Sequence, residues 1–446
     1  MPLRRTIKSI SQPSHPEDAS VRQLKPVLRQ PNFRCLWLAN AFESAADDLL
    51  RTLLPIIAVS ALGAGAFQVS ILTALSLSAF LLLGIPVGVW VDRMRKRRIL
   101  IGADILRATV LLTIPVAFAT DTLSIWHLLV VAAVISVADV FFTTADSTAL
   151  PMVVGANQLD EATARLLTAK NTISVAAPGI AGLLLRTIAA PFVLLLSALA
   201  YLSSAFLLNS VHLPESVQTG SGKKVNFWES AREGLAFTLN HRELRPLFTS
   251  NMLINASTML GASAKVVFAL NILLISPAMF ASLGVLGAVG ALLGSLAAMP
   301  IVRFLGIGAC RVSASLLSIV VVAFIPLAGS LPGSPVIWVG LSTAGWSFLT
   351  AVIVVAGSGI IPRLTETAML GRVSSCIRLF TLGIMPIASL AGGALAVWLG
   401  LVPTLWIWAC VAGAAALPIL ASPIRSWKVF PEHLDVNQRK VNPPNA

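Results

Sequence analysis

Long apolar runs are the sequence feature that most restricts how this chain can fold. Between clusters of charged and turn-forming residues there are about twelve such runs, each close to the roughly 20 residues that a helix needs to cross a bilayer. Inside lipid the backbone must satisfy its own hydrogen bonds, so only helices and closed barrels span a membrane. The runs are continuous and lack the apolar–polar alternation of barrel strands. The predicted spans are 34–59, 67–91, 99–119, 126–149, 162–187, 190–209, 247–271, 277–302, 310–330, 335–360, 373–399 and 402–421.

Composition excludes a soluble domain. Of the 446 residues, 56% are hydrophobic and 11% are charged, whereas a soluble domain carries about 25% charged residues. A soluble chain of this composition would lack the polar surface to cover itself. The fold class that we predict is therefore an all-α, polytopic membrane protein.

The predicted spans fall into two six-helix halves, residues 33–209 and 247–421. Between them lies a polar cytosolic linker, 210–246, in which "FWESAREGLAFTL" is typical of a helix on the membrane surface. A disordered basic tail, 1–32, precedes the first half, and a second tail, 422–446, follows the second. Six plus six spans are typical of transporters built from repeated halves.

Lysine and arginine predict the orientation, because they are retained on the cytoplasmic side. With both termini inside, the inner segments carry the basic residues, and the predicted outer loops near 60–66, 120–125, 272–276, 331–334 and 400 carry none. Only Arg186 breaks the pattern. We expect a multi-pass plasma-membrane protein with both termini cytoplasmic. Anionic lipid suffices to explain the net charge of +13, without a nucleic-acid partner.

Charge gathers abruptly in the stretch "GVWVDRMRKRRILIGADILRA". No Asp, Glu, Lys or Arg occurs from Thr52 to Val91, and six charged residues then follow within seven positions. By its charge alone this stretch is a topology signal for a short cytoplasmic loop.

The same stretch resembles the loop signature of the major facilitator superfamily: glycine, three residues, Asp-Arg and a basic cluster. The matching residues are Gly84, Gly88, Asp92, Arg93, Lys96 and Arg97, while Arg95 replaces the usual glycine before the basic pair. "NFRCLWLANAFESAADDLLRTLLP", "TADSTALPMVV" and "LGRVSSCIRLF" resemble the macrolide-efflux and siderophore-exporter branch of drug/proton antiporters. One departure matters, because such antiporters often carry an arginine in the fourth span and 126–149 contains none.

The resemblance implies a secondary transporter that exports an amphipathic small molecule, such as a macrolide-like drug or siderophore, against inward proton flow. Its partners would be that molecule, protons and the lipid bilayer, with the protein a monomer. Two alternatives remain open. An uptake symporter would use the same fold, and a membrane receptor or assembly factor would show no flux.

The loop signature predicts an inner gate. Gly84 and Gly88 form a small-xxx-small face on which helices approach closely. Asp92 is placed to cap a neighbouring helix N-terminus, and the resemblance implies that this neighbour is 373–399. Asp146, at the inner end of its span, is placed to meet the basic loop. Our hypothesis is that Asp92 and the basic run form an inner latch, and the alternative is topology alone.

Charges inside predicted spans are functional candidates, because unpaired charge is costly in a bilayer. Glu43, Asp47 and Arg51 share one helix face with i+4 spacing, and Asp48 lies beside them. Like charges as close as Asp47 and Asp48 do not both ionise easily. The proton-coupling candidates that we select are Asp47, Asp48, Asp139 and Glu43.

The expected charge partners are Arg51, with Asp47 or Asp48, and Lys170, with Glu43. A static ion pair is the alternative for Arg51. We interpret Asp104 and Arg107 as a local i,i+3 pair rather than a site, and we expect Lys265 to extend outward from its helix end. Pro178, Gly179 and Gly182 resemble the Gly-Pro motif that antiporters of this superfamily carry on the fifth span, where small residues permit close helix packing.

No motif favours an enzyme. The sequence contains no GxxxxGK[ST] loop, no HExxH motif and no CxxC pair among its four cysteines. We therefore expect no catalytic residues, no cofactor and no metal site.

Overall fold

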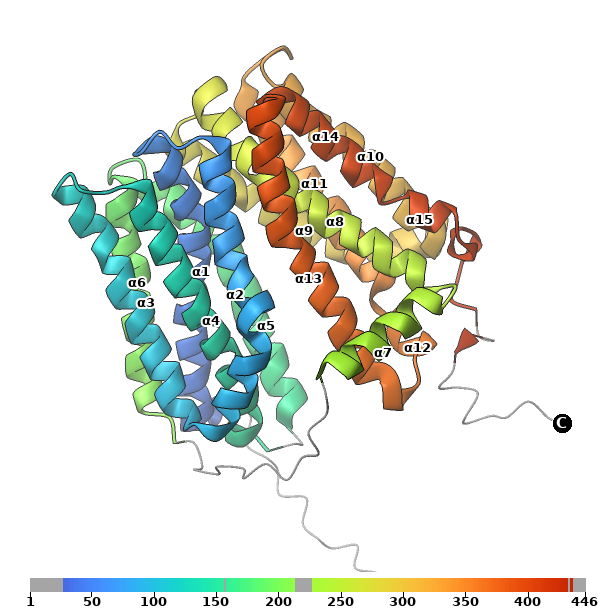
Figure 1. Cartoon of the computed structure of the whole chain (residues 1–446), viewed down its shortest axis with the longest axis horizontal. Helices are drawn as coiled ribbons and strands as arrows, with labels where there is room; N and C mark the ends of the chain where they lie inside the picture. The colour runs from blue at the N-terminus through green and yellow to red at the C-terminus, as the bar shows by residue number, and fades with distance from the viewer. Residues whose placement is uncertain (1–26, 156–157, 213–226, 432–433, 436–446) are drawn as a thin grey trace, which may run out of the picture.

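The computed structural model describes residues 27–155, 158–212, 227–431 and 434–435, and all regular secondary structure in these residues is helical. Two bundles stand side by side in Figure 1, one formed by α1–α6 and the other by the helices from α8 onward. The long helices are α1 (Pro31–Ser60), α2 (Ala66–Arg93), α3 (Lys96–Ala119), α4 (Ile125–Val153), α5 (Leu159–Leu184), α6 (Ala190–Asn209), α8 (Leu244–Val267), α9 (Pro277–Leu305), α10 (Ile307–Leu327), α11 (Pro335–Ser358), α13 (Thr367–Trp398) and α14 (Leu401–Ala414). The shorter elements are η1 (Val27–Arg29), α7 (Phe227–Asn240), η3 (Phe268–Ile272), α12 (Ile360–Leu364), α15 (Leu417–Leu420) and η4 (Pro423–Ser426).

Helix ends follow local sequence signals. Ser124 and Ser276 cap α4 and α9, each accepting a backbone N–H bond of 3.3 Å from the residue three positions on. The turns after α9 and α13 use Gly306 (φ 88°) and Gly400 (φ 94°), in backbone conformations that other residues rarely adopt. The apolar runs thus become helices, and glycine permits the tight reversals between them.

Ten described helices or helix pairs are long and apolar enough to cross a membrane. The two other long helices, α1 and α5, have 30 and 26 residues and carry the charged residues discussed below. Both pack inside the first bundle, α1 against α5 and α6. The all-α polytopic fold is therefore confirmed, and the count of twelve spans stays a prediction.

The two halves meet mainly through α2 with α13 and α5 with α9. At the end where α2 begins, the backbones are close, because a β-carbon on Gly393 would lie 3.1 Å from the Phe67 α-carbon and 1.9 Å from Ser70 Oγ. Ser389 there donates a 3.1 Å hydrogen bond to the Ser70 carbonyl. At the opposite end, β-carbons on Gly88 and Gly371 would meet nothing within 4 Å. The halves are therefore closed together at one end and apart at the other.

Two segments expected to be tails are partly packed. Residues 1–26 and 436–446 lie outside the described residues, but Val27 in η1 is buried with Phe33 in one apolar cluster. Near the C-terminus, Ile424 and Trp427 join an apolar cluster of the second half. The Trp427 carbonyl accepts a 3.1 Å bond from the Gly308 amide at the start of α10. Expected tail residues 27–32 and 423–430 therefore belong to the folded body.

The linker contains the expected helix, α7, while residues 213–226 lie outside the described part of the chain. A β-carbon on Gly234 would lie 2.8 Å from the Arg372 carbonyl, so α7 packs closely on the first turns of α13. Arg372 also forms a 2.7 Å ion pair with Glu233. In Figure 1, α7 lies at the lower end of the second bundle, beside α12 and α13, on the side where the halves are apart.

Candidate functional site

Arg107, on α3, lies at the centre of a buried carboxylate cluster. Its side chain is 0% exposed, and one guanidinium nitrogen lies 3.1 Å from Glu43, 3.5 Å from Asp47 and 2.8 Å from Asp139. The other terminal nitrogen donates to Asp104, one turn away on the same helix. One arginine thus joins acids from α1, α3 and α4.

Aromatic side chains hold the guanidinium on both sides. Its central carbon lies 4.4 Å from the ring centroid of Phe142 and 4.5 Å from that of Tyr201, which is cation–π geometry. The Tyr201 hydroxyl donates a 2.6 Å hydrogen bond to Asp47. The rings therefore position Arg107 and one of its acids together and extend the cluster to α6.

Negative charge exceeds positive charge in this cluster, since four carboxylates surround one guanidinium. Asp104 Oδ2 and Arg107 Nε are buried and have no hydrogen-bond partner among the described residues. A single guanidinium does not neutralise four carboxylates, so this buried site keeps an excess of acidic side chains.

The predicted local i,i+3 pair of Asp104 and Arg107 is present. It is not isolated, because Arg107 also reaches three acids on other helices. The signal in the sequence was a fully charged pair inside the otherwise apolar stretch 99–119. The sequence alone did not show that the arginine paired with Asp139 lies on α3 rather than on α4.

The predicted Glu43–Lys170 pair is also wrong. Glu43 is buried and pairs with Arg107, whereas Lys170 is exposed. Exposed lysine keeps its hydration, and Glu43 on the α3 side of α1 has a closer partner. Lys265 does not extend outward as expected, because its Nζ donates a 2.8 Å bond to Thr343 on α11.

Asp47 and Asp48 have different surroundings, although they are adjacent. Asp47 contacts Arg107, Tyr201 and, at 3.7 Å, Arg51. Asp48 Oδ2 is buried without a hydrogen-bond partner among the described residues. Successive residues on a helix point about 100° apart, so only Asp47 joins the cluster. The Arg51 pair predicted from spacing is present, with Arg51 71% exposed.

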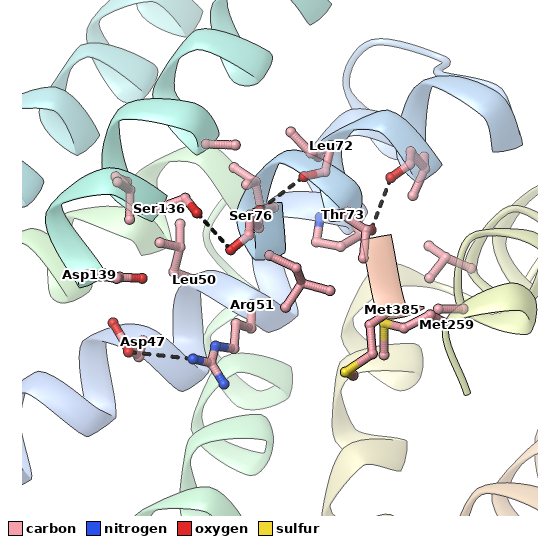
Figure 2. A pocket seen from close by; sticks show the side chains of 18 residues that line it. Asp47, Leu50, Arg51, Leu72, Thr73, Ser76, Ser136, Asp139, Met259 and Met385 are labelled. Carbon is pink, nitrogen blue, oxygen red and sulfur yellow. Dashed lines mark hydrogen bonds and ion pairs between the residues drawn. The ribbon is translucent and has the colours of Figure 1, made fainter. Parts of the chain in front are cut away.

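A cavity of about 420 Å³ lies between the halves and reaches this cluster. Asp47, Arg51 and Asp139 line it from α1 and α4, and Met259 and Met385 line it from α8 and α13. Figure 2 shows the three charged side chains on one side and the two methionines on the other. Asp139 is 29% exposed, so it joins the buried cluster to the cavity. The cavity thus combines an ionised wall with an apolar one.

A second cavity, of about 250 Å³, continues the first and shares Arg51, Asp139 and Met385 with it. Its other wall includes Arg378 on α13. Ser136, which lines both cavities, donates a 3.0 Å bond to the Ser76 carbonyl and ties α4 to α2. The combined space extends along the interface between the halves.

The basic loop after α2 contacts its own half of the molecule. Arg97 donates to the last carbonyls of α6, including Leu208 at 3.3 Å, and to the Asn209 side chain at 2.8 Å. Lys96 donates to the Val91 carbonyl at the end of α2, and Arg93 is exposed. Cations at helix C-termini are favourable because they meet the negative end of the dipole.

The close helix approach expected at Gly84 and Gly88 is absent from this conformation. A β-carbon at either position would meet nothing within 4 Å, because the halves are apart at this end. The Asp92 side chain lies outside the described residues. Asp146 accepts a 3.1 Å hydrogen bond from Asn40 on α1. The expected contact with the basic loop is not among the hydrogen bonds of the described residues. The latch hypothesis therefore concerns another conformation.

The motif on α5 packs as its small residues suggest. A β-carbon on Gly182 would lie 2.8 Å from Ser282 Cβ, and one on Gly179 would lie 3.1 Å from Val285. Pro178 contacts the face of Gly284. These residues bring α5 and α9 together at the closed end.

Comparison with known proteins identifies relatives of this chain. Residues 36–350 match the family described as Major Facilitator Superfamily. Macrolide efflux protein A of Streptococcus pyogenes is 23% identical over 214 residues, which are 48% of this chain and 52% of that protein. The protein of the same name from Enterococcus faecalis is 25% identical over 182 residues, 40% of this chain and 56% of that protein. The chain thus spans about half the length of these curated relatives.

Solved structures share the fold over most of their length. A nucleoside transporter has a TM-score of 0.68 at 12% identity, covering 87% of this chain and 99% of that one. A bacterial homologue of the iron transporter ferroportin has a TM-score of 0.67 at 16% identity, covering 88% and 99%. At these identities the likeness concerns the fold alone.

Proposed function

Because the chain belongs to the major facilitator superfamily, we propose that this transporter exports an amphipathic small molecule in exchange for protons. The partial similarity to proteins named for macrolide efflux supports export of a macrolide-like compound. An uptake symporter of the same fold is the alternative.

The observation that supports the proposal is the contact between the carboxylate cluster and the cavity. Asp47 and Asp139 each touch Arg107 on one side and line the cavity on the other. A proton added to either acid weakens its ion pair with Arg107, and substrate in the cavity alters the same carboxylates. Protons and substrate therefore compete for one wall, which is the requirement for exchange.

The proposed cycle uses the arginine as a fixed counter-charge. When the acids are ionised, Arg107 holds α1, α3 and α4 together through Glu43, Asp104 and Asp139. Protonation of Asp139 frees part of the guanidinium for Asp47 and Glu43 and removes one negative charge from the cavity wall. Because α1, α3 and α4 all belong to the first half, the change alters the surface of that half that faces the second half.

We place the protein in the plasma membrane as a monomer, with both termini in the cytoplasm. In this orientation the open end, where α2 finishes and α13 begins, faces the cytoplasm. The conformation is then the one that loads substrate for export. The +13 net charge and its concentration in the predicted inner segments support this placement.

The test is flux in everted membrane vesicles that respiration acidifies inside. Export predicts that labelled erythromycin accumulates in vesicles with the protein and that an uncoupler abolishes the accumulation. Asp47→Asn combined with Asp139→Asn should remove it, while Glu161→Gln, an exposed acid on α5, should not. Loss of vesicle contents in the same gradient would instead establish uptake, and absence of flux for every compound tried would reject a transport role.

Substrate-induced proton release in detergent tests the coupling site. Asp47→Asn should reduce release because it removes an acid of the cluster, and Asp48→Asn should change it less. Full release in both variants would remove the α1 pair from the mechanism and leave Asp139.

A further inference from the structure

Arg378 is a cation in the cavity without a carboxylate partner. It lies on α13, is exposed, and has its guanidinium carbon 5.6 Å from the ring centroid of Phe80 on α2. No acid of the described residues lies within ion-pair distance of it, and the only acid in the sequence between 247 and 421 is Glu366. Arg378 lines the 250 Å³ cavity, whose other charged side chains are Arg51 and Asp139. The neighbouring ring supplies only a weak cation–π contact.

Arg51 lines the same 250 Å³ cavity from α1. Its link to Asp47 is 3.7 Å long, well beyond the about 2.7–2.9 Å of a charge-assisted hydrogen bond. With 71% of its side chain exposed, Arg51 has free donors. The cavity therefore has one loosely held arginine from each half of the molecule.

Asp139 is the acid of this cavity, and it is paired with the buried Arg107. One of its oxygens accepts a 2.8 Å bond from the Arg107 guanidinium. The two other charged side chains of this lining, Arg51 and Arg378, are both cations. An anionic group placed between them meets two guanidinium groups, which present the planar donors that carboxylates bind.

We propose that Arg51 and Arg378 form a subsite for the carboxylate head group of an amphipathic ligand. The rest of the lining suits an apolar body, because Leu77, Leu81, Leu379, Leu382 and Met385 surround the same space. This subsite rests on the proposed function, since it specifies which substrates the transport cavity accepts. Among amphipathic molecules that enter the cavity, it favours those with a carboxylate head group over their uncharged esters.

A ligand held by both arginines also connects the two halves. Arg51 belongs to α1 in the first half and Arg378 to α13 in the second. Binding of one carboxylate to both guanidinium groups favours conformations in which α1 and α13 are near. The subsite thus couples recognition of the head group to closure of the open end.

The experiment measures binding to the purified full chain in a neutral detergent. The probe is 11-(dansylamino)undecanoic acid, whose fluorescence rises in an apolar site, and its methyl ester is the uncharged match. Empty micelles give the background. We expect tighter binding of the acid than of the ester, and Arg378→Gln and Arg51→Gln should each weaken acid binding by at least about tenfold, as expected for a lost charged hydrogen bond. Ester binding should not change.

Arg363→Gln is the matched control, because Arg363 makes a similar cation–π contact, with Phe430 at 5.3 Å, outside both cavities. It should retain acid binding, and Arg378→Lys should retain part of it, which also shows that the site still folds. The proposal is overturned if Arg378→Gln binds the acid as wild type does, or if the ester or the cationic dansylcadaverine binds as tightly as the acid. Binding is read without any gradient, so acid-specific binding with no proton-coupled flux would reject only the transport proposal.

Discussion

Arg107 and Asp139 form a 2.8 Å ion pair between α3 and α4, 32 residues apart in the chain. The pair joins a fully buried guanidinium to an acid that reaches the cavity. It places a cation beside one of the two acids of α4, the fourth long helix, which carries no arginine itself. Substitutions in the ion-pair network around this pair test both the stability of the first half and its proposed role in proton coupling.

Replacing Arg107 with glutamine should destabilise the first half strongly. Removing one partner of a buried ion-pair network costs about 3–5 kcal/mol, because uncompensated charges stay behind. The midpoint of thermal unfolding, followed by size-exclusion chromatography of heated samples, should fall markedly. Arg165→Gln removes an exposed 3.9 Å pair on α5 and should change the midpoint little.

Adding Asp104→Asn to Arg107→Gln provides the second check. Neutralising the nearest acid removes part of the leftover repulsion, so the double variant should recover part of the lost midpoint. A wild-type midpoint for Arg107→Gln alone would show that the network contributes nothing to stability.

Asp139→Asn should distinguish the effect of the Asp139 charge on transport from the effect of its packing between helices. Asparagine keeps an oxygen that can accept from Arg107, so the protein should insert and purify normally. If Asp139 supplies a negative point for substrate, efflux of cationic compounds should fall more than efflux of neutral ones, and Asp139→Glu should keep part of the activity. The measurement is vesicle transport of a cationic and a neutral compound side by side.

Equal loss for both compounds would favour a proton role for Asp139. Unchanged transport of both would mean that the carboxylate only packs between helices, and the candidates on α1 would then remain.

Gly182→Ala should weaken the closed end. The new β-carbon would lie 2.8 Å from Ser282 Cβ and 2.9 Å from the Ala278 carbonyl, so α5 and α9 must move apart. Forcing extra volume into a packed contact costs about 1–3 kcal/mol. The thermal midpoint and transport should both fall.

Gly102→Ala is the matched control for that change, because a β-carbon there meets nothing within 4 Å on helix α3. Alanine should even stabilise the helix slightly, by about 0.5–1 kcal/mol. Equal effects of the two substitutions would argue against tight packing between α5 and α9.

The open end should close during transport. Spin labels at Gly88→Cys and Gly371→Cys report on α2 and α13, at positions with free space around them. Their distance distribution, measured by pulsed electron resonance, should gain a shorter component when substrate and a proton gradient are supplied. The background must lack the native cysteines Cys35, Cys310, Cys376 and Cys410.

Asp92→Asn should remove that shorter component and impair transport at normal protein level, because the latch hypothesis needs its charge. A distribution that never changes, or normal transport by the variant, would contradict the hypothesis. Arg425→Gln, on η4 of the second half, serves as the control for a charge change on the same face.

Sequence reasoning was strongest where the cause is local. Arg51 with Asp47 and Arg107 with Asp104 follow from spacing on one helix, and both pairs are present. It failed for contacts between helices, which depend on how each helix is rotated and on which helices lie beside it. Glu43 was assigned to Lys170 and contacts Arg107 instead, because α1 presents that face to α3.

The sequence by itself determined that this chain builds long membrane helices, because lipid leaves a continuous apolar run no other stable backbone conformation. The sequence also identified the acids of α1 and α4 as candidates and contains the motif that resembles the family's loop signature. Only the tertiary structure decided that acids from three helices converge on Arg107, that Asp139 reaches the cavity, and that Gly88 faces open space. Ion pairs between helices depend on how the helices are rotated and packed against each other. Apolar surfaces alone do not specify that packing, since many rotations bury them equally well.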